Sequence, residues 1–168
     1  MTKLDVKILV MSPNDVKDER DIVDEVVAGL NDNIGETYRM NLRVLRWERL
    51  AGDVGMRPQE LINLEFLARD DIRICVGIMW KRLGSPSGGV DPSGREYEAG
   101  TIEELQQALA MKRKSGSGWP RILFYRCMRP FYATTVAENE QYGKVIKFFE
   151  QFDPDGEHPG LYDSYETD

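Results

Sequence analysis

A chain of 168 residues, 41% hydrophobic and 30% charged, has the size and composition of one soluble globular domain. The formal net charge of -7 argues against a nucleic acid as the main partner. Neither a membrane-spanning stretch nor a signal-peptide pattern is present, so we expect a cytoplasmic protein. With a single histidine, His158, the chain has almost no material for a zinc site or a histidine-based triad. The apolar surroundings of Cys75 and Cys127 favour two buried thiols over a disulfide or a metal pair.

The first part of the chain predicts two strands separated by one helix. Apolar and β-branched residues predict a buried strand at residues 6–11, which the segment Ser12-Pro13-Asn14-Asp15 ends with candidate N-caps. Residues 42–47 form the second strand, whose arginines favour a sheet edge. The helix between them, at about residues 16–30, has an apolar face that comprises Ile22, Val23, Val26, Val27 and Leu30.

The middle of the chain predicts the centre of the sheet and a long irregular loop. A glycine turn at residues 52–55 precedes a helix over residues 58–68, which begins with Pro58. Residues 72–79 are the most apolar strand, and this places them centrally. A loop with four glycines follows, and a helix of residues 101–113 comes after it. Loops of this length in compact domains are usually functional or disordered.

The last part of the chain adds a strand at residues 121–125, a helix at about 137–152 and a short fifth strand at 160–165. Because strands alternate with helices, we expect a doubly wound α/β domain. Its parallel sheet has four to five strands in a flavodoxin-like arrangement, with helices on both faces. Such sheets bind ligands between their first and third strands. The loops that follow those two strands therefore form the expected site.

Two glutamates at the start of the third helix have different predicted roles. Thr101 suits an N-cap, and Glu104 three residues later completes a capping box. Alternatively, Glu104 lines the ligand pocket. At about 100° per residue, Glu104 lies beside the apolar face of the helix, whereas Glu103 points into water. We therefore take Glu104 as the candidate functional carboxylate.

The familiar nucleotide-binding and hydrolase motifs are absent: the chain has no GxGxxG, no GxxxxGK[ST] and no GxSxG. Carboxylates, arginines, hydroxyls and aromatic rings around a glycine-rich loop remain. Such a set suits a ribose or a nucleotide. The predicted ligand-binding residues are Ser12, Asp15, Trp80, Arg82, Gly84, Ser85, Tyr97 and Thr101. Among them, Ser12 and Asp15 would hold ribose or phosphate oxygens, Arg82 a pyrophosphate, and Trp80 or Tyr97 a base.

The segments ILVMSPNDVKDERDIV, VLRWE, RPQELIN, DIRICVGIMWKRLGSPSG, SGREYEAGTIEELQQA and RILFY together resemble a TIR-like family catalogued as a domain of unknown function. That family opens many STAND/NACHT-type ATPases and NLR-like proteins. The GTIEELQQA stretch is also similar to nucleoside deoxyribosyltransferases and to TIR NAD hydrolases, whose catalytic glutamate matches Glu104. Ile102 departs from the pattern, because many relatives carry glutamate there.

The resemblance implies three alternatives for one domain covering residues 1–168, either a complete product or part of a longer STAND/NLR-like protein. In the first, the domain cleaves the N-glycosidic bond of NAD or a related nucleotide at Glu104, as an immune or antiphage signalling effector. In the second, it is a non-enzymatic module that self-associates and acts on a STAND/NACHT ATPase in cis or in trans. The third is base exchange on nucleosides. None of them requires a bound cofactor.

Overall fold

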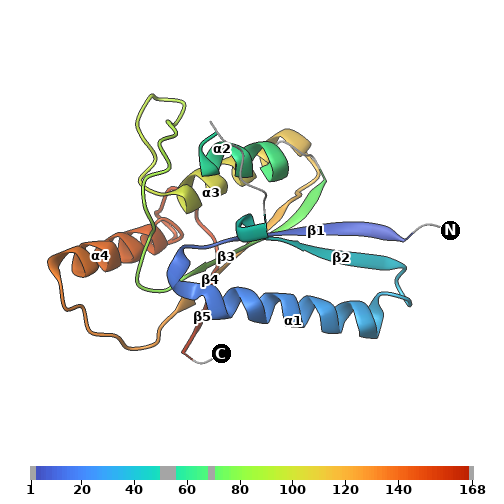
Figure 1. The fold of residues 1–168 in the computed structure, drawn as a ribbon. Coiled ribbons are helices and arrows are strands. Elements are labelled where there is room, and N and C mark those ends of the chain that lie inside the picture. The colour runs from blue at the N-terminus through green and yellow to red at the C-terminus, as the bar shows by residue number, and fades with distance from the viewer. Residues whose placement is uncertain (1–2, 50–55, 68–70, 167–168) are drawn as a thin grey trace.

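The computed structural model describes residues 3–49, 56–67 and 71–166 and shows a doubly wound α/β fold (Figure 1). Its five strands pair in the order β2-β1-β3-β4-β5, and every pair is parallel. The strands are β1 (Leu4–Met11), β2 (Met40–Leu45), β3 (Ile72–Met79), β4 (Arg121–Cys127) and β5 (Asp163–Tyr165). The prediction of a parallel sheet with β3 at its centre and β2 at an edge is confirmed.

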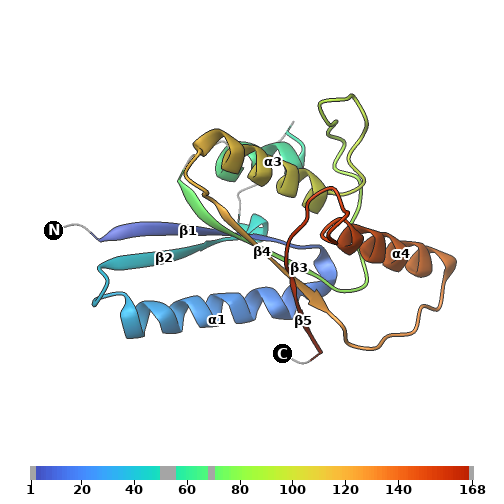
Figure 2. The same cartoon turned by 180° about the vertical axis from the view of Figure 1, so that it is seen from behind.

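Helices cover both faces of the sheet. They are α1 (Lys17–Ile34), α2 (Pro58–Ile62), α3 (Gly100–Ser115) and α4 (Val136–Glu150). Figures 1 and 2 show α1 on one face and α2 with α3 on the other. On that second face, Leu9 and Met11 of β1 belong to one buried hydrophobic cluster with Leu105 of α3 and Phe149 of α4. This cluster fixes the first turn of α3 against the carboxyl end of the sheet.

The apolar face predicted for the first helix is partly wrong. Val26 and Leu30 are exposed, with relative accessibilities of 56% and 39%, whereas Val27 is buried. The inner face of α1 instead includes the buried Arg20, which is 3% exposed, and the half-buried Asn31, whose amide exchanges two hydrogen bonds with the backbone of Leu42 in β2. The side of α1 that faces the sheet thus includes polar side chains that have specific hydrogen-bond partners. A prediction that considers only the spacing of apolar residues does not include them.

The predicted capping box at Thr101 and Glu104 is also wrong. The N-cap of α3 is Ala99, no side chain caps the helix, and Thr101 lies inside the first turn. The helix that does carry a Thr–Glu capping box is α4, through Thr135 and Glu138. The first turn of α3 therefore leaves the Glu104 carboxyl free for another role.

Smaller differences concern the ends of elements. The second helix is interrupted after Ile62 by a π-helical turn, Asn63–Leu67, while its predicted end at Ala68 and the predicted turn at residues 52–55 lie outside the described residues. The strand β4 continues to Cys127, two residues beyond its predicted end. Cys75 and Cys127 are free and buried, as expected. In the described part of the chain, no helix is both long enough and apolar enough to cross a membrane.

Candidate functional site

A cleft of about 210 Å³ opens where β1 and β3 end. This is the point at which the strand order reverses, because β2 and β3 lie on opposite sides of β1. Three segments form its walls: the turn after β1, the helix α2 with Trp47 nearby, and the loop of residues 80–99, here called the β3–α3 loop, which joins the start of α3. The lining side chains include Ser12, Trp47, Gln59, Arg82, Ser85, Thr101 and Glu104.

Glu104 is the ionisable group most strongly perturbed by this environment. Its side chain is buried, with 5% relative accessibility, although it borders the cleft. Burial raises the pKa of the Glu104 carboxyl from 4.5 to about 8; a hydrogen bond from Gln59 lowers this pKa, and the negative charges of Glu103 and Glu48 raise it further. Glu104 is therefore mostly protonated at neutral pH. A strongly perturbed carboxyl in a cleft is typical of a functional site.

Glu103 does not point into water, so the prediction for this residue is wrong. Its side chain is as buried as that of Glu104, at 5%. The Asn63 side-chain amide donates to Glu103 Oε1 at 2.7 Å, and the Ser87 hydroxyl donates to Oε2. The turn after α2 and the β3–α3 loop cover this side of α3, and a helical-wheel argument from α3 alone contains neither of them.

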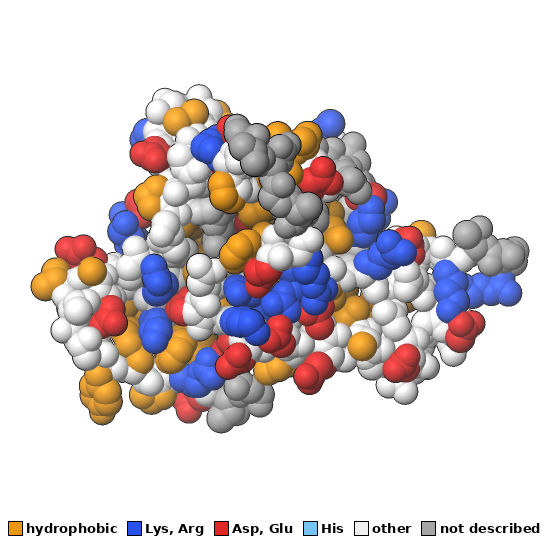
Figure 3. All heavy atoms as spheres, in the orientation of Figure 1, with side chains coloured by type: hydrophobic (Ala, Val, Ile, Leu, Met, Phe, Trp, Pro, Cys, Tyr) orange, Lys and Arg blue, Asp and Glu red, His pale blue; other side chains and the backbone are white. Residues whose placement is uncertain are grey.

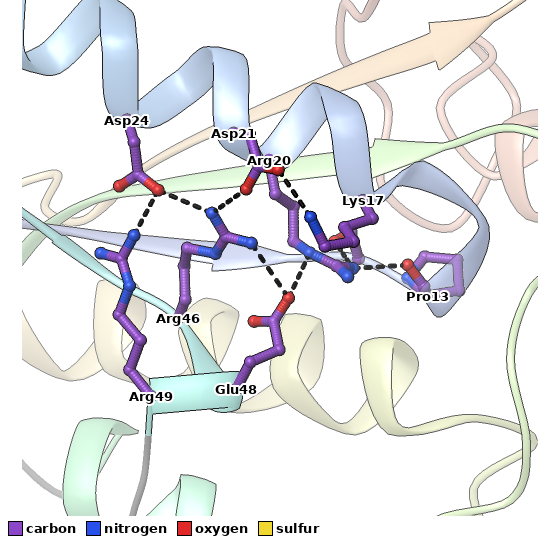
Figure 4. A network of polar contacts seen from close by, with 9 residues as sticks. Pro13, Lys17, Arg20, Asp21, Asp24, Arg46, Glu48 and Arg49 are labelled. Atoms are coloured by element: carbon purple, nitrogen blue, oxygen red, sulfur yellow. Dashed lines mark hydrogen bonds and ion pairs between the residues drawn. The ribbon is translucent and has the colours of Figure 1, made fainter.

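A buried ionic network supports the β1 side of the cleft (Figure 4). Arg20 donates to the Ser12 hydroxyl at 3.0 Å and to the Pro13 carbonyl at 2.7 Å, and its Nε lies 2.6 Å from Glu48 Oε1. Arg46 continues the network to the carboxylates of Asp21, Asp24 and Glu48. Figure 3 shows basic and acidic side chains gathered between α1 and the rest of this face. Because Arg20 donates to the Ser12 oxygen, the Ser12 O–H remains available to donate to a ligand.

Arg82 separates the Glu104 cleft from a second cavity of about 370 Å³, because it lines both. Asp15 belongs to this second cavity rather than to the cleft, and burial raises the pKa of its carboxyl. The Lys81 backbone N–H donates to Asp15 Oδ2 at 3.2 Å. Gln141 of α4 accepts hydrogen bonds from the backbone N–H groups of Leu83 and Gly84 and thus ties the loop to this cavity. The two cavities are neighbours that share one cation.

Two predicted residues lie outside both cavities. Trp80 donates from its indole Nε1 to the Arg129 carbonyl at 2.9 Å and makes an edge contact with the Phe131 ring, so it packs under the segment that joins β4 to α4. Tyr97 lines a third cavity, of about 640 Å³, between the β3–α3 loop and α4. Thus the structure brings six predicted residues together around one cleft: Ser12, Arg82, Gly84, Ser85, Thr101 and Glu104.

Sequence reasoning missed Trp47 and Gln59, both of which line the cleft. Gly100 gives a signal for Gln59: an added Cβ there would stand 2.5 Å from Gln59 Oε1, so a larger residue at position 100 would displace the end of the Gln59 side chain. A glycine inside the first turn of a helix, where other residues favour the helix more, is consistent with such a close contact. Among the described residues, no group of three or more His, Cys, Asp or Glu side chains is arranged to hold a metal ion.

Comparison with known proteins does not assign the chain to a family. No family model matches it, and no curated protein matches it. Three crystal structures of S. aureus homoserine dehydrogenase, at pH 6.5, 6.0 and 8.5, are similar over 96%, 99% and 88% of this chain, with 12%, 12% and 16% identity. The chain spans about a third of their length (32%, 34% and 30%), and each TM-score is 0.37, which is too low to support any argument about function.

Proposed function

We propose that the domain cleaves the N-glycosidic bond of NAD or a related nucleotide, with Glu104 as the carboxylate beside C1′ of the ribose. The observation that supports this proposal is the buried Glu104 carboxyl at the border of the cleft between β1 and β3. Loss of the base builds positive charge on the ribose, and an ionised carboxylate on the opposite face stabilises that charge or forms a covalent intermediate. Water or another acceptor then completes the transfer.

The raised pKa of Glu104 favours a cationic substrate. The protein around Glu104 stabilises the neutral carboxyl, because burial and the nearby charges of Glu103 and Glu48 oppose ionisation. The positive charge of the NAD pyridinium would attract the ionised form of Glu104 and so lower the pKa of this carboxyl. Binding of NAD should therefore release a proton from Glu104, whereas a neutral nucleoside gives no such gain.

The polar groups around Glu104 suit the rest of such a substrate. Ser12, Ser85 and Thr101 supply hydroxyls for the ribose, and Arg82 supplies a cation for the pyrophosphate. Ligand pockets typically measure roughly 300–1,000 Å³, so the cleft of about 210 Å³ suits half of a dinucleotide. The second cavity beyond Arg82 would take the other half. In this proposal the domain works in the cytoplasm, where its buried free thiols stay reduced, and clusters with other copies or a partner ATPase when active.

The test measures the base released from NAD, from nicotinamide mononucleotide and from neutral nucleosides, by protein that has first been assembled with a crowding agent. Release of nicotinamide, with kcat/KM rising with pH through about 8, is expected, because kcat/KM reports the free enzyme's ionisation. Base exchange on neutral nucleosides, with kcat/KM falling over the same range, would instead identify Glu104 as a general acid. Assembly without release of any base would identify a non-enzymatic module.

A further inference from the structure

Glu103 is a buried carboxylate to which the proposed reaction gives no role. A carboxylate buried at 5% accessibility requires hydrogen-bond donors, and Asn63 and Ser87 provide them. The backbone also approaches it closely: a Cβ added at Gly89 would lie 2.5 Å from Glu103 Oε2. Glu103 is therefore the point where the β3–α3 loop and the turn after α2 meet on α3.

Other contacts fasten the same part of the loop. Arg57, at the start of α2, donates to the Ser87 carbonyl at 2.8 Å. Within the loop, the Tyr97 N–H donates to the Gly89 carbonyl at 2.9 Å, and at its end the Gly100 N–H donates to the Ser85 carbonyl at 3.2 Å. Residues 85–89 thus lie against α2 and α3, while the outer part of the loop projects beyond the sheet (Figure 1).

The cleft begins two residues before this attachment, because Gly84 and Ser85 line it. A displacement of Ser87 from Glu103 would therefore move the rim that faces the ribose. We propose that Glu103 is a positioning residue: it holds the β3–α3 loop against α2 and α3 and so fixes the rim of the cleft beside Glu104. The inference rests on the proposed function for its catalytic consequence, but the attachment of the loop is independent of any reaction.

The charge of Glu103 has a second effect, on its neighbour. It adds to burial and to Glu48 in raising the pKa of Glu104. The pKa of the Cys75 thiol is in turn raised by burial and, to a smaller extent, by the Glu104 charge. On its other side Glu103 raises the pKa of Tyr97, after the larger effect of burial. The cation nearest to Glu103 in this contact network is Arg57, whose guanidinium donates to the Ser87 carbonyl. Neutralising Glu103 should therefore lower the pKa of Glu104.

Two variants separate the attachment from the charge. Ser87→Ala removes the hydroxyl that donates to Glu103 and accepts from the Gly89 N–H, and it keeps the charge of Glu103. Amide exchange over residues 85–89 should therefore accelerate at least about tenfold, as expected for the loss of a hydrogen bond to a charged group. Its KM should rise, and the pH midpoint of kcat/KM should stay unchanged. Glu103→Gln keeps the size but removes the charge, so the pH midpoint should fall. Its amide offers one acceptor oxygen in place of two, so it can no longer accept from both Asn63 and Ser87, and exchange over residues 85–89 should also rise. The control is Ser93→Ala, whose hydroxyl contacts Asp91 and Arg95 within the loop.

The outcomes separate this inference from the proposed function. Neither amide exchange nor the titration of the Glu104 carboxyl, which is followed by ¹³C NMR, requires the protein to turn over a substrate. If wild type releases no nicotinamide but Ser87→Ala still loosens residues 85–89, the glycosidase proposal fails and the attachment stands. If Ser87→Ala exchanges like Ser93→Ala and keeps the wild-type KM, or if Glu103→Gln leaves the Glu104 titration unmoved, the inference is overturned.

Discussion

Replacing Glu104 by glutamine should change how the stability of the fold depends on pH. The carboxyl has an ordinary pKa of 4.5 and a pKa of about 8 in the folded protein. Because the folded-state pKa is the higher one, the neutral carboxyl's contribution is fully present below the ordinary pKa. It is lost as pH rises through about 8. Glutamine stays neutral throughout, so Glu104→Gln should not show this loss.

The size of the effect follows from the pKa difference. Each pKa unit corresponds to about 1.4 kcal/mol, and the carboxyl moves from 4.5 to about 8. The free energy of unfolding of wild type should thus fall, relative to the variant, by up to about 5 kcal/mol between acidic and alkaline pH. Water that enters the cleft beside Glu104 reduces this figure, so we expect roughly 3–5 kcal/mol. Near pH 5 the two proteins should agree within about 1 kcal/mol, because glutamine and the neutral acid have similar size.

The assay is urea unfolding of both proteins at about pH 5, 7 and 9, compared as a difference at each pH so that common groups cancel. Glu98→Gln is the matched control, since it neutralises an exposed carboxylate just before the same helix, with 60% side-chain accessibility. Its difference from wild type should stay small at every pH. A Glu104→Gln difference that is equally flat would refute the burial of an ionisable Glu104 and the reasoning built on it.

Three further predictions concern the sheet and the cleft. Arg82→Met should raise the KM for NAD about tenfold or more through loss of a charge-assisted contact with the pyrophosphate, and should leave the melting temperature unchanged because Arg82 is exposed; an unchanged KM would remove Arg82 from the site. Gly77→Ala should destabilise the fold by about 1–3 kcal/mol, because its Cβ would stand 2.2 Å from Phe124 Cε1, and an unchanged urea midpoint would contradict this packing. Amide exchange should be slowest in β1 and β3, and fast exchange across β3 would contradict its central position.

The sheet could be predicted because its signal is local. The apolar run Ile72–Met79 and the alternation of strands with helices determine a parallel sheet with β3 inside, and the structure agrees. The place of the cleft followed from the strand order, since β1 and β3 adjoin where that order reverses. Glu104 could be chosen over Glu103 as the candidate functional carboxylate because it borders the apolar face of its own helix.

The predictions that failed depend on contacts between distant segments. Glu103 is polar and lies opposite the apolar face of α3, so the pattern of this helix alone predicts that Glu103 is exposed to solvent. Asn63 and Ser87, 40 positions before it and 16 positions before it, bury it instead. Trp80 follows β3 directly, yet it packs on Arg129 and Phe131, far along the chain. Periodicity within one element contains no information about such partners.

The most direct test of the central claim is nicotinamide release in a single turnover at about pH 9, where Glu104 is ionised. Wild type, Glu104→Gln and Glu98→Gln are assembled in the same way and mixed with NAD in amounts below the protein concentration. We predict that Glu104→Gln binds NAD but releases nicotinamide roughly a thousandfold more slowly than wild type, while Glu98→Gln matches wild type. Equal rates for wild type and Glu104→Gln would contradict the assignment of Glu104 as the carboxylate at the ribose.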